Sequence, residues 1–477
     1  MEKTQGEPIG VFQAYSDVEE GEIVVNKIKQ LHMREDYSYN DFAILYRTNA
    51  QSRIFEEALR KRGIPYKIYG GLSFYQRKEV KDVIAYFRLA VNPSDEEAFK
   101  RVINYPARGI GDTTLNKIVG AAVLHGVSLW KVLCEPLAYG LNINKGTHTK
   151  LQGFRELVEG FIRDAQEKDA AEVGGNIVRQ SGIMNEIYQD RTPENLSRQE
   201  NIEELVNGMH DFVATRREEG NERVALTDYL QEVSLLTDQD SDKEGDGEKV
   251  TLMTIHSAKG LEFKNVFVVG LEENLFPSPM CAESPRGLEE ERRLFYVAIT
   301  RAEEHCYLSF AKSRFRFGKT EFSSPSRFLK DIDVRYLDVP QGEQLARSVD
   351  EGAGRFRASQ EMGPRFRESS PHQQPMGRRF MESSHGEQPM GSRFATSSPV
   401  QQSRTFKKVS SISPSRPAAS PSVGGLQVGN VIEHERFGIG DVVAVVGSGD
   451  NCKATVRFRN AGEKQLLLKF ARFKVIG

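Results

Sequence analysis

The chain has 477 residues, a length that exceeds a single hydrophobic core and predicts three or four structural units. Charged residues make up 28% of the sequence, and no apolar run approaches the roughly 18 residues of a membrane span, so a soluble protein is expected. The formal net charge of −2 argues against a protein that coats nucleic acid through bulk charge. Any DNA binding is therefore expected from local basic patches.

The start of the chain and its cysteines indicate the compartment. The first ten residues lack a basic region followed by an apolar stretch, so no signal peptide is expected. Four cysteines are scattered along the chain, without a C-x-x-C pair and without a histidine at metal-ligand spacing: Cys134, Cys281, Cys306 and Cys452. This pattern argues against a disulfide framework and against a zinc site, and it fits a reducing cytoplasm.

Residues 1–92 alternate between strand-like and helix-like stretches. An apolar run at 42–46 is typical of a buried parallel strand, and a second strand is expected at 66–69. Amphipathic spacing predicts one helix at 52–62 and another at 78–92, which a proline follows. The pattern is that of an α/β unit.

Residues 93–248 differ from the segment before them. Long helical patterns, such as those at 151–165 and 202–217, predict a separate all-helical unit without strands. The unit ends in an acidic, glycine-containing stretch at 238–248, which we interpret as an exposed loop.

The α/β character returns in residues 249–340. Strands are expected at 250–254, 266–269 and 306–311. A helix is expected at 288–303, with three glutamates in its first turn, where the helix dipole favours negative charge. We therefore interpret the helical unit as an insertion into one α/β domain.

Residues 341–425 are rich in Ser, Pro, Gln and Gly, and they repeat the motif Met-Gly-x-Arg-Phe from Met362, Met376 and Met390. Between 351 and 425, eleven Lys or Arg residues stand against five Glu and no Asp. Such a segment buries too little apolar surface to offset its ordering entropy, so a disordered basic tether is expected. A plain linker is the favoured role, and weak single-strand binding by the Arg-Phe repeats is the alternative.

Residues 426–477 recover the signals of β structure. The stretch 453–459 alternates strictly between apolar and polar residues, and 442–446 is an apolar strand. Turns are expected at 437–440 and 447–449. A small β-barrel accounts for this pattern.

The first candidate site lies in residues 250–263. A strand leads into a polar loop that holds His256, Lys259 and Glu262, and a second strand leaves the loop. Loops at the carboxyl ends of parallel strands are where ligands bind. An ordinary surface loop with solvated charges explains this segment equally well when it is taken alone.

The second candidate is Arg301. On a helix it shares one face with Leu294, Val297 and Ala298, so it lies on the apolar stripe and needs an anionic partner. The residues alone leave open whether that partner is a carboxylate of a structural salt bridge or a phosphate.

Residues 69–82 and 108–118 are two further polar segments. In the second, Gly109, Ile110 and Gly111 open a helix whose free N–H groups are able to meet a phosphate. An ordinary helix N-terminus is the more common explanation of such a sequence.

Taken together in chain order, the four segments resemble the C-terminal motifs of superfamily 1 DNA helicases of the UvrD/PcrA/Rep type, with motif V at 251–263 and motif VI at 290–302. The resemblance runs from about residue 10 to 335, and residues 426–477 resemble the Tudor-like module of the same family. It implies a RecA-like parallel-sheet domain 2A, interrupted by a helical insertion domain 2B, and then a linker and a small Tudor- or SH3-like barrel. The implied boundaries are 1–92 and 249–340 for domain 2A, 93–248 for domain 2B, 341–425 for the tether and 426–477 for the barrel.

The resemblance also implies nucleotide contacts. Glu262 would bind the ribose hydroxyls of ATP, with Lys259 and Gly260 beside the nucleotide. Arg301 would be the arginine finger that reaches the γ-phosphate, a group typically worth a factor of about 10³–10⁵ in phosphoryl transfer.

DNA contacts are implied in the same way. Thr254 and His256 would touch single-stranded DNA and couple it to the nucleotide. Contacts to the duplex backbone would come from Gly109, Ile110, Gly111 and Thr113. Such contacts carry affinity and salt dependence, and they do not read the base sequence.

A helicase of this type needs a P-loop, G-x-x-x-x-G-K-[ST], and an acidic box for magnesium. This sequence contains neither motif: its Gly-Lys-Thr at 318–320 has Ser313 in place of the first glycine and follows a strand. ATP and Mg²⁺ would therefore be bound mainly by an N-terminal lobe, 1A/1B. Alone, this chain is expected neither to hydrolyse ATP nor to unwind DNA.

The leading interpretation is the C-terminal part of an ATP-dependent 3′→5′ DNA helicase that acts in DNA repair and replication restart, in the cytoplasm and at the nucleoid of a bacterial-type cell. Its expected partners are single-stranded DNA, junctions of single and double strands, and the N-terminal lobe, without a membrane. The alternative is a non-enzymatic DNA-binding or adaptor protein. It would hold duplex DNA through residues 93–248 and dock a protein such as RNA polymerase through residues 426–477.

Overall fold

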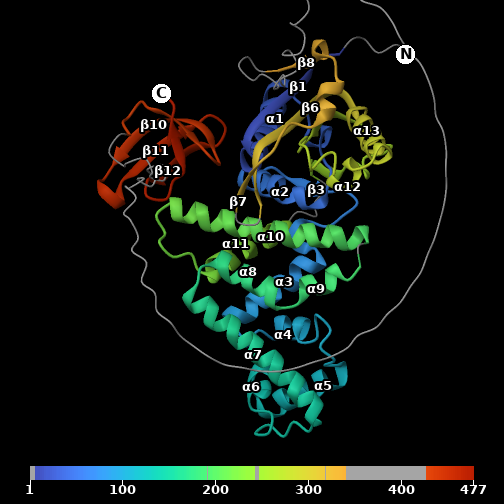
Figure 1. Ribbon diagram of the computed structural model, residues 1–477, viewed down its shortest axis with the longest axis vertical. Helices are drawn as coiled ribbons and strands as arrows, with labels where there is room; N and C mark the ends of the chain where they lie inside the picture. The colour runs from blue at the N-terminus through green and yellow to red at the C-terminus, as the bar shows by residue number, and fades with distance from the viewer. Residues whose placement is uncertain (1–5, 191, 242–246, 317–318, 340–425) are drawn as a thin grey trace, which may run out of the picture. The chain divides into compact units, whose positions relative to one another are not determined.

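The computed structural model describes residues 6–190, 192–241, 247–316, 319–339 and 426–477 (Figure 1). The predicted tether at 341–425 and its repeats lie outside the described residues. Among the described residues, no helix has the length and the apolar character needed to cross a membrane.

An eight-stranded sheet organises the first part of the chain. Its strands lie in the order β3-β4-β2-β5-β6-β1-β8, with β7 beside β6. Every neighbouring pair on this path is parallel, and only β7 is antiparallel to its neighbour. The strands are β1 Ile9–Ser16, β2 Phe42–Tyr46, β3 Tyr66–Ile68, β4 Val250–Thr254, β5 Phe263–Val268, β6 Ala302–Arg316, β7 Lys319–Phe322 and β8 Leu337–Asp338. The predicted parallel α/β fold is confirmed.

The sheet is buried on both faces. Successive side chains of a strand point to opposite faces, so Ala43 and Leu45 of β2 enter one hydrophobic core while Ile44 and Tyr46 enter the other. The core that contains Ile44 and Tyr46 is covered by α1 (Asp17–Glu35) and α2 (Ser52–Lys61). The core that contains Ala43 and Leu45 is covered by α13 (Pro285–Ile299). A short helix, α12 (Pro279–Ala282), precedes α13. The apolar run of β2 is thus the consequence of burial on both sides.

A long helical segment connects β3 to β4. These two strands are parallel neighbours, with Tyr66 opposite Val250, so the segment is an insertion between adjacent strands of one sheet (Figure 1). Its helices are α3 Lys78–Val91, α4 Glu96–Val102, α5 Asp112–His125, α6 Leu129–Cys134, α7 Lys145–Glu167, α8 Ala170–Gln180, α9 Ile183–Tyr188, α10 Pro193–Glu218 and α11 Leu226–Ser241. The helical core already includes Phe74 and the buried side chains of α3. The boundary at residue 92 stays a prediction.

The last described segment is a five-stranded antiparallel sheet in the order β12-β11-β10-β9-β13. The strands are β9 Val431–His434, β10 Gly438–Val446, β11 Lys453–Phe458, β12 Gly462–Leu467 and β13 Phe473–Val475. The turn predicted at 437–440 is wrong, because Gly438 and Gly440 lie in β10. A Cβ on Gly440 would come within 2.7 Å of Phe458, so the glycine permits close packing of the strand and does not mark a turn.

Helix α13 is displaced from the helix predicted at 288–303. Ser284 caps it by accepting a hydrogen bond from the Gly287 N–H at 3.0 Å, and Pro285 occupies its first turn. The helix ends at Ile299, and β6 begins three residues later. The glutamates at 289–291 therefore lie beyond the first turn, and their interpretation as partners of the helix dipole is wrong.

Helix α11 corrects a second expectation. It continues to Ser241, so the first residues of the acidic loop predicted at 238–248 are helical. Residues 242–246 of that stretch lie outside the described residues.

Candidate functional site

The loop at 255–262 joins two opposite edges of the sheet. It leaves β4 at the carboxyl edge, directly after Thr254, and enters β5 at the amino edge, directly after Glu262. Because β4, β2 and β5 are parallel, these two ends cannot belong to one site. The residues predicted from this segment therefore divide into a carboxyl-edge group and an amino-edge group.

The amino-edge group brings Glu262 and Arg301 together. Strands β5 and β6 pair in parallel with Phe263 opposite Ala302, so the residues just before them are neighbours. Arg301 donates from Nη1 to the carbonyl oxygen of Leu261 at 3.0 Å. The proximity of Glu262 and Arg301 follows from the register of the two strands, and their roles stay a prediction.

The guanidinium of Arg301 is held by neutral acceptors. Nε donates to the carbonyl oxygen of Val297 at 3.1 Å, and Nη2 donates to Oγ1 of Thr300 at 3.1 Å. Within the described residues no carboxylate forms an ion pair with Arg301. A half-buried guanidinium without an internal anion is suited to an external one, such as a phosphate.

The location of Arg301 corrects the argument that selected it. The arginine was expected on the apolar stripe of a helix, but α13 ends at Ile299 and Thr300 caps it. Arg301 lies in the connection to β6, where its own backbone carbonyl accepts from the Phe263 N–H at 3.0 Å. Its position is fixed by the sheet edge and not by helical periodicity.

The remaining amino-edge residues are exposed. Glu262 has no hydrogen bond or ion pair with any described residue, so its carboxylate is available to accept from hydroxyl groups. Lys259 and Gly260 are exposed as well. Gly260 has φ +87, a conformation that favours glycine and turns the loop back toward β5.

The carboxyl edge holds Thr254 and His256. Thr254 Oγ1 lies 3.0 Å from Ser257 Oγ and accepts from the Ser257 N–H at 3.3 Å, which fixes the turn after β4. His256 is exposed on this turn. Although the residue is exposed, partial desolvation by the surrounding protein and the nearby guanidinium of Arg47 place the pKa of His256 below its ordinary value, while the carboxylate of Glu291 opposes that shift.

Sequence reasoning missed Arg47. The residue follows β2 directly and so lies at the carboxyl edge beside the end of β4. It forms an ion pair with Glu291 of α13, with Nη2 2.7 Å from Oε1. A basic residue immediately after a buried apolar strand was the signal available in the sequence.

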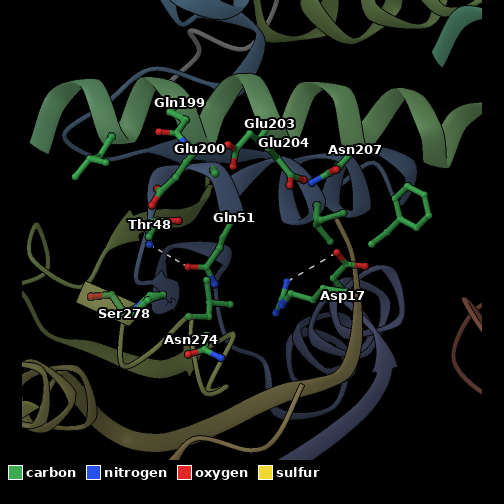
Figure 2. Close-up of a pocket in the computed structure, with 17 residues that line it drawn as sticks. Asp17, Thr48, Gln51, Gln199, Glu200, Glu203, Glu204, Asn207, Asn274 and Ser278 are labelled. Carbon is green, nitrogen blue, oxygen red and sulfur yellow. Dashed lines mark hydrogen bonds and ion pairs between the residues drawn. The ribbon is translucent and has the colours of Figure 1, made fainter. Parts of the chain in front are cut away.

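A cavity of about 310 Å³ adjoins this edge and was not predicted either. Figure 2 shows Glu200 projecting from α10 toward Thr48, which follows β2, with Glu203 and Glu204 further along the same helix. The acidic lining makes this cavity unsuited to a phosphate. Within the described residues no group of three or more His, Cys, Asp or Glu side chains is arranged to hold a metal ion.

The helical segment carries the second predicted DNA site. Gly109 has φ +68 and accepts at its carbonyl from Lys150 Nζ at 3.2 Å, and Gly111 is the N-cap of α5. Gly109, Gly111 and Thr113 are exposed, whereas the side chain of Ile110 is buried in the helical core. Of Ile110, only the backbone is therefore left for the predicted DNA contact at this turn.

The Gly-Lys-Thr segment does not open a helix. Lys319 and Thr320 begin β7, which pairs antiparallel with β6. A P-loop places its lysine at the start of a helix that follows a strand, so this segment has the wrong structural context.

Comparisons with known proteins identify the family. A family model described as the UvrD-like helicase C-terminal domain matches residues 1–313, and one described as the PcrA/UvrD tudor domain matches residues 428–474. A protein named ATP-dependent DNA helicase PcrA from Leuconostoc citreum is 33% identical over 475 residues, which cover 98% of this chain and 58% of that protein. The protein of the same name from Staphylococcus aureus (strain Mu50) is 39% identical over 339 residues, which cover 70% of this chain and 45% of that protein.

The chain spans about half the length of the curated relatives it matches. The first family model covers more than half of this chain. The parallel sheet, the helical insertion and the C-terminal antiparallel sheet are consistent with that match. The chain therefore belongs to the UvrD/PcrA-type helicase family, of which it contains the C-terminal part.

Proposed function

We propose that this chain is the C-terminal part of an ATP-dependent 3′→5′ DNA helicase that acts in DNA repair and replication restart. The observation that carries the proposal is the pair at the amino edge, where Arg301 has no carboxylate partner among the residues that the structure describes and lies beside the exposed Glu262. The names of the relatives support ATP and DNA as substrates. The polarity and the cellular processes rest on the family resemblance alone.

The amino edge is proposed to close over a nucleotide that another lobe holds. Arg301 would contact the γ-phosphate, and Glu262 would accept hydrogen bonds from the ribose hydroxyls. Lys259 and Gly260 would line the same nucleotide. Mg²⁺ and the P-loop contacts would come mainly from an N-terminal lobe, 1A/1B.

The carboxyl edge is proposed to contact single-stranded DNA. Thr254 ends β4, His256 lies on the turn that follows, and Arg47 lies nearby after β2. The exposed backbone at Gly109 and Gly111 would contact the phosphates of the duplex ahead of the junction. Residues 426–477 would dock a protein partner, for which the family resemblance suggests RNA polymerase. The protein would act in the cytoplasm, at the nucleoid.

DNA binding by the purified chain tests this proposal against the adaptor alternative. Fluorescence anisotropy would compare a blunt duplex with the same duplex carrying a 3′ single-stranded tail. The proposal predicts tighter binding to the tailed duplex, and His256→Ala should reduce that preference while leaving blunt-duplex affinity unchanged. Equal affinity for both DNAs, with no effect of His256→Ala, would favour the adaptor.

A further inference from the structure

The ion pair between Arg47 and Glu291 occupies the carboxyl edge of the sheet. Nε of Arg47 lies 3.0 Å from both carboxylate oxygens of Glu291, and Nη2 lies 2.7 Å from Oε1. This is a fork-like contact of the kind that guanidinium groups also make with phosphates. The carboxylate therefore stands where an external anion would bind Arg47.

The pair is unequally buried. The side chain of Glu291 is 4% exposed, whereas that of Arg47 is 19% exposed. Glu291 also accepts from the Ser278 N–H at 3.3 Å, and Nη1 of Arg47 has no hydrogen-bond partner among the described residues. Arg47 thus retains a donor for a second anion, while Glu291 depends on Arg47 for its charge partner.

Glu291 and Arg301 belong to one rigid element and its immediate extension. Helix α13 carries Glu291 at the carboxyl edge and ends at Ile299, about 12 Å further along at 1.5 Å per residue. Arg301 follows at the amino edge, held by the carbonyl oxygens of Val297 and Leu261. A displacement of the helix at one edge is therefore transmitted to the guanidinium at the other.

We propose that Glu291 is an internal substitute for a DNA phosphate on Arg47, and that its displacement by DNA moves α13 and so repositions Arg301. This inference rests on the proposed function, because it assigns the coupling between its two sites to one side chain. A phosphate that shares Arg47 brings a second negative charge against Glu291. A phosphate that takes Arg47 completely leaves a buried carboxylate without a cation, which is strongly unfavourable. In both cases the contact that holds Glu291 becomes less favourable, which favours a displacement of α13.

Glu291→Gln tests the competition with nearly unchanged shape. Glu290→Gln is the matched control, since Glu290 is the adjacent carboxylate, is 60% exposed and pairs with Arg293. On a fluorescein-labelled oligothymidine, Glu291→Gln should bind about fivefold more tightly than the wild-type chain, because removal of a nearby like charge is worth about 1 kcal/mol. Glu290→Gln should change the affinity by less than about twofold, because an exposed charge is screened.

The direction of the change in DNA affinity shows whether Glu291 competes with DNA for Arg47 or only holds Arg47 in place. If Glu291 only held Arg47 in place, Glu291→Gln would loosen the guanidinium and weaken DNA binding. In an Arg47→Gln background the gain from Glu291→Gln should disappear. An affinity of Glu291→Gln equal to or below that of Glu290→Gln overturns the proposal.

Hydrogen exchange of the wild-type chain and of Glu291→Gln tests the transmission. Saturating oligothymidine should change the exchange of the amides at 297–303, which surround Arg301, and this change should be lost in Glu291→Gln although the variant still binds DNA. Bound DNA without any change at 297–303, or the same change in Glu291→Gln, rules out the coupling. A wild-type chain that binds no oligothymidine contradicts the proposed function itself.

Discussion

Arg301 donates a hydrogen bond from Nη1 to the carbonyl oxygen of Leu261, 3.0 Å away, and this contact sets the guanidinium beside Glu262. The two residues come from segments about 40 positions apart, and the parallel register of β5 and β6 makes them neighbours. Within the described part of the chain, Arg301 has no carboxylate partner and Glu262 has no hydrogen bond or ion pair, and the two share one edge of the sheet. That arrangement is expected where a phosphate and a hydroxyl-bearing group bind side by side.

Replacement of Arg301 should remove activity without removing the fold. In a protein that joins this chain to a P-loop lobe, Arg301→Ala should lower the kcat of ATP hydrolysis by a factor of about 10³–10⁵, the usual contribution of an arginine finger. The measurement is steady-state ATPase with saturating single-stranded DNA. Arg293→Ala is the control, because Arg293 is 72% exposed and pairs with Glu290 on the same helix. Similar losses in both variants would show that Arg301 has no special role.

The protonation of His256 predicts a pH dependence of DNA binding. Burial and Arg47 lower the pKa of His256 below 6.5, so its imidazole is neutral at pH 7 and should add no charge-based affinity there. Oligothymidine affinity from this residue should increase only as the pH falls below about 6.5. Arg47→Gln removes a cause of the shift, so the increase should begin at higher pH. A His256→Gln chain with the same pH profile as the wild type would contradict this assignment.

The same shift has a consequence for stability with a defined sign. The folded-state pKa of His256 is lower than the unfolded value, so protonation favours the unfolded chain. The contribution of His256 to the free energy of unfolding is complete above the unfolded-state pKa of about 6.5, and it is lost as the pH falls below that value through the lower folded-state pKa.

A single methyl group at residue 109 should damage the duplex site. Gly109 has φ +68, a conformation that is strained for any residue with a Cβ, and that Cβ would also contact Lys150 Nζ. Gly109→Ala should therefore strain the turn by about 1 kcal/mol or more and reduce the affinity for blunt duplex. Gly120→Ala in α5 is the control, because its Cβ would meet nothing within 4 Å and should leave duplex affinity unchanged. Equal duplex affinities in the two variants would remove this turn from the DNA interface.

Arg53 should be essential for the contact between the sheet and the helical segment. Its side chain is 3% exposed and pairs with Glu204 of α10 at 2.6 Å, Glu57 at 3.1 Å and Asp211 at 3.6 Å. Arg53→Met removes the cation that these three largely covered carboxylates share and should lower the free energy of unfolding by about 3 kcal/mol. Arg198→Ala is the control, because it removes a more exposed ion pair with Glu194 within α10. This change should lower the free energy of unfolding by less than about 1 kcal/mol.

The loss in Arg53→Met should also depend on pH. Burial raises the pKa of Glu204 and Asp211 above their ordinary values, against the lowering effect of nearby arginines. Carboxyl groups with raised folded-state pKa values add stability at low pH and lose that contribution as the pH rises. Urea unfolding of Arg53→Met should therefore show a smaller deficit at pH 5 than at pH 8. A deficit that is constant or grows at pH 5 would contradict the burial of these carboxylates.

Much of the fold could be predicted from local patterns. The run at 42–46 is buried on both faces of a parallel sheet, and continuous apolar character is the local consequence of that environment. Helical periodicity located α2 and α3 within one residue of their ends. Boundaries failed where a cap or a close approach decided them, as at Ser284 before α13 and at Gly440 in β10.

The candidate site was only partly predictable. Motif resemblance selected Glu262 and Arg301, but their proximity depends on the register of two strands that no local pattern determines. The pair of Arg47 and Glu291 joins residues 244 positions apart, so only the folded chain reveals it. The acidic cavity beside α10 is equally non-local, because its lining comes from the sheet and from the helical segment.

ATP hydrolysis by the purified 477-residue chain tests the central claim most directly, namely that this polypeptide supplies only the Arg301 and Glu262 side of a nucleotide pocket. Phosphate release should be measured with and without oligothymidine, for the wild type and for Arg301→Ala. The account predicts that neither protein exceeds the rate of a protein-free control under either condition. Wild-type turnover that oligothymidine stimulates and Arg301→Ala abolishes would contradict it, because the whole pocket would then lie within this chain.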